Sequence, residues 1–127
     1  MKIEYIVNRD KKTVVARFKY DARKEIFRDL DRTVNYCRTF GLEQFIFNYK
    51  KPVGVAHYKD GDVFDENVGK EVAKDKLLRA YYRIVSKAAS YLDKKYQEFI
   101  ISEINRKKRH ADEMVNKMNQ ELTSHSK

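Results

Sequence analysis

The stretch IEYIVNRDKKTVVARF, residues 3–18, decides how the chain begins to fold. Its apolar side chains stand at every second position in two runs, Ile3, Tyr5 and Val7 and then Val14, Ala16 and Phe18. Residues 8–11, between the runs, have side chains that favour tight turns. A period of two that is interrupted by a turn predicts a half-buried β-hairpin.

The next segment predicts a helix over about residues 22–39. Asp21 is a candidate N-cap, because its carboxylate can accept a hydrogen bond from a free backbone N–H of the first turn. Apolar residues then follow at helical spacing, at Ile26, Leu30, Val34 and Cys37. Gly41 fits the left-handed conformation in which many helices end.

A second hairpin is predicted after this helix. Its two strands are indicated by residues at alternate positions, Phe45, Phe47 and Tyr49 and then Val53, Val55 and His57. Pro52, which cannot donate to a central ladder, fits the start of a strand or an edge. The turn residues at 59–62 end the second strand.

From Asp65 onward the chain predicts helix, with Gly69 as its only glycine and no proline. A first apolar stripe consists of Leu77, Tyr81, Val85, Ala88, Leu92, Tyr96 and Phe99. A second consists of Ile100, Ile104, Ala111, Met114, Val115, Met118 and Leu122. At about 100° per residue the two stripes are a quarter turn apart, so the helix either breaks near Asn105 or curves along a partner.

Together these elements predict an α+β fold. It has a small antiparallel sheet of two hairpins, one helix packed on the sheet, and a long C-terminal helical segment. We expect residues 1–99 to form the core domain and residues 100–127 to form a helical extension of that domain.

The charge balance is the most informative feature of the composition. Lys and Arg total 28 against 19 Asp and Glu, which gives a formal net charge of +9. An excess of positive charge predicts an anionic partner; the alternative is that the charge serves only to keep the protein in solution. The first residues carry no apolar signal core, and no apolar run is long enough to span a bilayer, so we expect a cytoplasmic protein that does not enter membranes.

Five cations share one face of the predicted C-terminal helix, opposite the first apolar stripe. We call this set the basic stripe: Lys76, Arg79, Arg83, Lys87 and Lys94. Cations lined along one helix face can follow a phosphate backbone, because each one that neutralises a phosphate releases a counterion. The alternative is an ordinary solvated face, although such faces usually interleave acidic residues.

A second basic cluster consists of Arg106, Lys107, Lys108 and Arg109. Four consecutive cations cover most of the circumference of a helix, so they can clamp phosphates or an acidic protein, or form a solvated junction between two helical segments. The apolar residues that follow, Ala111, Met114, Met118 and Leu122, are a candidate dimer seam.

The residue pattern argues against catalysis. No histidine pair has metal-ligand spacing, and neither a phosphate-cradling glycine motif nor a serine elbow is present. The acidic residues at 60–66 lack the spacing of a calcium loop and fit a turn followed by a helix N-terminus. We therefore predict no catalytic residue, no metal and no cofactor. A metal-dependent nuclease, whose carboxylates and histidine converge only in space, is the enzymatic alternative.

Three segments carry a resemblance: KTVVA at 12–16, PVGVAHYKDGDVFD at 52–65 and VGKEVA at 68–73. This pattern resembles short accessory proteins of phages and prophages of Gram-positive bacteria. No functional residue carries over from that family. Phe64 is expected to fill the core, Asp65 to cap the long helix and Gly69 to let that helix pack closely on the hairpin.

The resemblance implies a function class. Short phage proteins without catalytic motifs often bind a host machine or a defence complex, as CRISPR–Cas inhibitors do. We therefore predict a non-enzymatic binding protein that acts on DNA, RNA or a nucleoprotein complex such as an RNA-guided nuclease. The alternative is a protein-interaction or homodimerisation module that does not contact nucleic acid.

Overall fold

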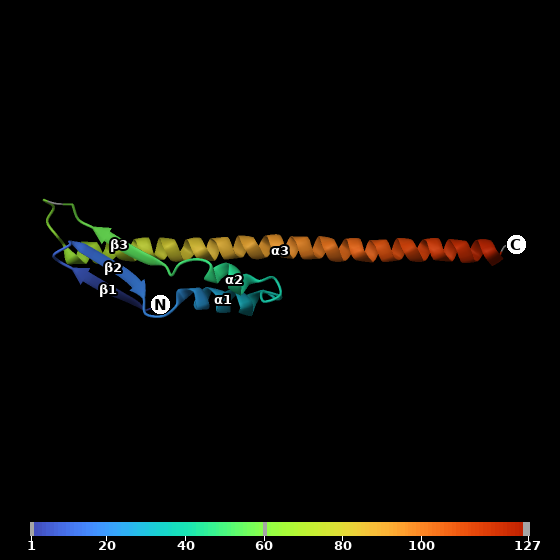
Figure 1. Ribbon diagram of the computed structural model, residues 1–127, viewed down its shortest axis with the longest axis horizontal. Helices are drawn as coiled ribbons and strands as arrows, with labels where there is room; N and C mark the ends of the chain where they lie inside the picture. Colours follow the sequence, from blue (N-terminus) through green and yellow to red (C-terminus); the bar gives the residue numbers. More distant parts are fainter. Residues whose placement is uncertain (1, 60, 126–127) are drawn as a thin grey trace. The chain divides into compact units, whose positions relative to one another are not determined.

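The computed structural model describes residues 2–59 and 61–125 and has the predicted α+β class (Figure 1). The elements follow in the order β1 (Ile3–Asn8), β2 (Thr13–Phe18), α1 (Ala22–Thr33), α2 (Leu42–Phe47), β3 (Val53–His57) and α3 (Glu66–His125). The chain divides into two compact units. Unit 1 extends to Leu92 and unit 2 begins at Asp93.

The first predicted hairpin is confirmed. β1 and β2 pair antiparallel, with Ile3 opposite Phe18 and Asn8 opposite Thr13. The turn between them is closed by Lys11 N, which donates to Asn8 Oδ1 over 3.1 Å. The sheet has three strands in the order β1-β2-β3, so β2 is its central strand.

The second predicted hairpin is wrong, because the segment before β3 is the helix α2. Residues 42, 45 and 46 share one face of α2, and Leu42 and Ile46 are buried there. The aromatic residues at 45 and 49 are compatible with both periods, and the one at 47 fits alternation alone, which is why alternation was misleading. β3 instead pairs antiparallel with β2, with Val55 opposite Val15.

The predicted helix over 22–39 is shorter than expected. Asp21 caps α1 as predicted, but the helix ends at Thr33 and turns follow. Tyr36 and Gly41 have φ values of 69° and 75°, and Gly41 precedes α2 rather than following α1. Cys37 is buried, as predicted, but it lies in these turns.

The core of unit 1 lies between the sheet and the first part of α3. Val14 and Ala16 of β2 are fully buried together with Ala73 and Leu77 of α3. The closest approach is at Gly54, where an added Cβ would lie 1.9 Å from the carbonyl oxygen of Ala73. Strand β3 therefore lies directly on the backbone of α3.

The structural roles predicted for Asp65 and Gly69 are confirmed, whereas Phe64 lies at the margin of the core and does not fill it. Asp65 Oδ1 accepts hydrogen bonds from the backbone N–H groups of Asn67 and Val68, which caps α3. Phe64 packs edge-on against Tyr58 at the margin of the core. A Cβ at Gly69 would lie 2.8 Å from Val14 Cγ2, so glycine permits close packing there.

Unit 2 consists of one helix, the second part of α3. The break considered near Asn105 is absent, because α3 is helical through this residue to His125. Most side chains of unit 2 are exposed, and the large apolar ones are among them.

Candidate nucleic-acid interface

Packing in unit 1 determines which side of α3 faces outward. Leu77, Tyr81, Ile84, Ala88 and Leu92 are buried in the core. A helix that buries one side must turn the opposite side outward. That outward side carries Arg79, Arg83 and Lys87, all of which are exposed.

This face also lacks local neutralisation. Residues 76–92 hold four cations and no acidic residue. Within the described part of the chain, no carboxylate lies within ion-pair distance of Arg79, Arg83 or Lys87. Several other arginines of unit 1 do have such partners; Arg17, for example, pairs with Glu4.

Lys76 differs from the rest of the basic stripe. Its Nζ donates to the carbonyl oxygen of Val55 over 3.0 Å, which ties α3 to strand β3. β3 pairs only with β2, so this carbonyl lies on an open edge of the sheet. A lysine at such an edge satisfies a free acceptor and discourages pairing with another strand. Lys76 therefore has a structural partner that the sequence did not indicate.

Two serines extend the same face. Ser86 and Ser90 are exposed and lie one helical turn from Arg83 and Lys87. Serine hydroxyls donate to phosphate oxygens in many protein–nucleic acid contacts. We call Arg79, Arg83, Ser86, Lys87 and Ser90 the basic face. The helical spacing of Ser86 and Ser90 was the signal that could have found them.

The other predicted basic residues belong to unit 2. Lys94, Lys107, Lys108 and Arg109 are exposed, and Arg106 forms an ion pair with Glu103. The predicted set of nine cations is therefore two sets, one in each unit. In unit 2, the predicted seam residues Ala111, Met114, Met118 and Leu122 are also exposed.

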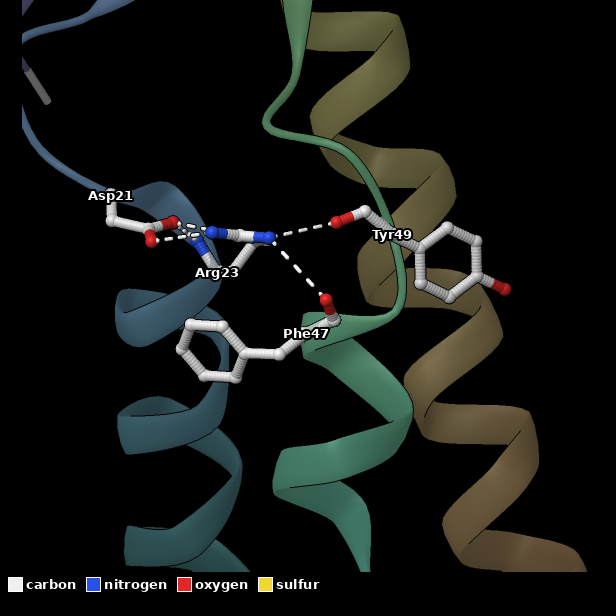
Figure 2. Close-up of polar contacts among 4 residues, drawn as sticks. All are labelled: Asp21, Arg23, Phe47 and Tyr49. Carbon is white, nitrogen blue, oxygen red and sulfur yellow. Dashed lines mark hydrogen bonds and ion pairs between the residues drawn. The ribbon is translucent and has the colours of Figure 1, made fainter.

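A polar cluster that sequence reasoning did not identify joins α1 to α2 (Figure 2). The guanidinium of Arg23 donates to both carboxylate oxygens of Asp21, at 3.0 and 2.9 Å. It also donates to the carbonyl oxygens of Tyr49 and Phe47, at 2.9 and 3.4 Å, and lies 4.8 Å from the centre of the Phe47 ring. Figure 2 shows the guanidinium between Asp21 and these carbonyls.

The side chains of Asp21 and Arg23 are largely buried, so their pairing is protected from water. The hydrogen bonds from Arg23 lower the pKa of Asp21, and the reciprocal contact raises the pKa of Arg23. With Asp21 also capping α1, this cluster holds the start of α1 against the end of α2.

Tyr91 makes a second connection within unit 1. Its hydroxyl donates to the carbonyl oxygen of Phe40, and its ring stacks on Phe45 at 4.3 Å between ring centres. The turn before α2 is thereby fixed to α3. These contacts place Tyr91 in a structural role.

The acidic residues at 62–66 have structural partners. Asp65 caps α3, Asp62 Oδ2 accepts from Lys59 N, and Glu66 pairs with Arg9 and Lys70. Asp60 lies outside the described residues. Among the described residues, no three metal-ligating side chains lie close enough together to hold an ion.

Burial raises the pKa of the Cys37 thiol, which disfavours the reactive thiolate.

Comparisons with protein-family models, curated proteins and solved structures found no match to this chain. The resemblance to phage accessory proteins stays a prediction. No helix in the described part of the chain has an apolar stretch sufficient to cross a membrane.

Proposed function

We propose that this chain binds nucleic acid without catalysis, through the basic face of α3. The proposal rests on Arg79, Arg83 and Lys87, which form a row on the side of α3 opposite its buried face. All three side chains are exposed, and none has a carboxylate partner among the described residues. Since the core fixes the opposite side of the helix, this row is held outward before any ligand arrives.

The spacing suits a phosphate backbone. Neighbouring cations are four residues apart, which is about 6 Å along the helix axis, and the row spans about 12 Å. A helix fits the major groove of duplex DNA, which is also about 12 Å wide. Arg and Lys neutralise phosphates there, and the hydroxyls of Ser86 and Ser90 add neutral donors.

The composition of this face favours phosphates over a lipid surface. The basic face consists of Arg, Lys and Ser, and Tyr82 is the large exposed side chain beside it. Binding to a membrane surface by an amphipathic helix requires an apolar face as well, and here the apolar side of the helix is buried in the core.

The wider proposal is that the target is a nucleoprotein complex, such as an RNA-guided nuclease of a host defence system. It is supported by the phage-like pattern at residues 52–65 and 68–73 together with the basic face. A cationic protein of this kind would contact guide RNA or target DNA rather than mimic DNA.

The test is fluorescence anisotropy of labelled duplex DNA, single-stranded DNA and RNA, titrated across a series of salt concentrations. We compare the wild-type chain with Arg79→Glu/Arg83→Glu/Lys87→Glu. The matched control is Lys2→Glu/Lys11→Glu/Lys24→Glu, which changes the net charge equally at exposed positions of unit 1. Thermal unfolding by circular dichroism verifies that both variants are folded.

We expect the basic-face variant to lose binding more than tenfold and the control to lose much less. The slope of log affinity against log salt concentration should fall by roughly 3, because about 0.9 counterions are released for each phosphate neutralised. Equal losses in both variants would mean that net charge, not this face, drives binding. Absence of binding by the wild type would reject the proposal and favour an acidic protein partner.

A further inference from the structure

Unit 2 exposes a long apolar stripe that the chain does not cover within that unit. Ile101, Ile104, Val115 and Leu122 are each more than half exposed, and Met118 is nearly so. A single helix in water gains most of its stability from packing an amphipathic face against something else. The stripe therefore requires an occupant.

The spacing of the stripe has the period of a coiled coil. Positions three and four residues apart alternate without interruption from 101 to 125: Ile101, Ile104, Lys108, Ala111, Val115, Met118, Leu122 and His125. We call these eight residues the seam. Because α3 does not break at Asn105, residues before this point join the seam, and Met114 of the seam predicted from sequence becomes a flanking residue.

We propose that the occupant of the seam is a second copy of this chain, in a parallel two-stranded coiled coil. In heptad terms Ile101, Lys108, Val115 and Leu122 occupy position a, and Ile104, Ala111 and Met118 occupy position d. A single lysine at a specifies register and oligomer state at a cost in stability. Its long stem lets the Lys108 ammonium reach water at the margin of the seam.

The flanking charges favour self-association. Lys107 is at position g, and Asp112 is at position e of the next heptad. In a parallel dimer, Lys107 of each chain faces Asp112 of the other, which gives two equivalent attractive pairs. Neither side chain has an ion-pair partner among the described residues, so both can form these contacts.

The same charges argue against the opposite orientation. An antiparallel dimer that aligned the full seam would place Asp112 next to Asp112 of the other copy, although it would also bring Lys107 next to Glu121. Among the residues that the structure describes, the remaining flanking pairs of the parallel dimer are Ile100 with Asn105 and Met114 with Asn119, which carry no like charges. Parallel pairing is therefore the arrangement of this seam without flanking repulsion.

Sedimentation velocity of the full chain over a range of protein concentrations tests the proposal. The seam variant is Ile104→Ser/Val115→Ser. The matched control is Phe99→Ser, which removes an exposed apolar side chain at position f, away from the seam. Near-ultraviolet circular dichroism checks that the tyrosine environments of unit 1 are retained in each variant.

We expect the wild type and Phe99→Ser to form dimers as the concentration rises, and the seam variant to remain monomeric. A wild type that is monomeric at every concentration would overturn the proposal. So would a dimer that survives in the seam variant. Monomers whose unit 2 is protected from proteolysis by anionic phospholipid vesicles would assign the stripe to a lipid surface instead.

A charge exchange tests the orientation. Lys107→Glu should weaken the dimer roughly tenfold, because two attractive pairs become repulsive. Adding Asp112→Lys to the same chain should restore most of the affinity, since the parallel pairs then re-form with reversed signs. A double variant that binds no more tightly than the single one would overturn parallel pairing, because antiparallel chains would only exchange the repulsion between the two Asp112 side chains for repulsion between two lysines.

Discussion

The two parts of α3 differ in what their apolar residues contact. Leu77, in unit 1, is fully buried, whereas Leu122, in unit 2, is 66% exposed, although both are leucines on apolar stripes of one helix. In unit 1 the sheet supplies the surface that covers the stripe. Amphipathic periodicity therefore identifies the helix face that needs a partner, but it does not show whether the chain itself supplies that partner.

The largest expected effect is at the closest contact of unit 1. Gly54→Ala places a Cβ on the carbonyl oxygen of Ala73, and a backbone atom cannot rotate away as a side chain can. We expect a loss of about 4 kcal/mol in the free energy of unfolding, beyond the usual cost of overpacking. Urea unfolding measures it, with Val53→Ala at the exposed neighbouring position as control. A loss below that of the control would show that β3 does not lie against α3.

The second prediction makes the same substitution in both parts of the helix. Leu77→Ala should lower the free energy of unfolding by about 3 kcal/mol, because it leaves a cavity in a packed core. Leu122→Ala should change it by less than about 0.5 kcal/mol in dilute protein, as for exposed sites in general. Equal effects at low concentration would contradict the difference between the units. At high concentration Leu122→Ala should also weaken the proposed dimer.

The third prediction concerns the cluster between α1 and α2. Arg23→Ala should cost about 2 kcal/mol, because it leaves Asp21 and the carbonyls of Phe47 and Tyr49 without their donor. Thermal unfolding measures it. Arg28→Ala, which removes an exposed ion pair with Glu25, is the control and should cost no more than about 1 kcal/mol.

The same cluster gives a dependence on pH. Because Arg23 lowers the pKa of Asp21, the pair stabilises the fold above the ordinary aspartate pKa of about 3.9, and the stability is lost as pH falls through the lowered value. The difference between the wild type and Arg23→Ala should therefore shrink at strongly acidic pH. A difference that does not change with pH would show that the Asp21 charge is not involved.

Local patterns identified those elements in which one period was clear. The hairpin over residues 3–18 combined alternation with turn residues, and Asp21 and Asp65 were recognised as caps because each precedes a helical pattern. The helix α2 was missed because its apolar residues fit two periods at once. Burial of Leu42 and Ile46, which only the folded chain shows, selects the helical one.

Sequence patterns were sufficient to predict the fold class, the helical character of residues from Glu66 onward and the grouping of Arg79, Arg83 and Lys87 on one helix face. These features follow from periods of two and 3.6 residues within single elements. The folded chain was needed to show that Lys76 donates to Val55, that Arg23 joins α1 to α2, and that the stripe of unit 2 is uncovered within that unit. Each of these depends on contacts between distant residues, or on their absence within unit 2, and a local period does not specify them.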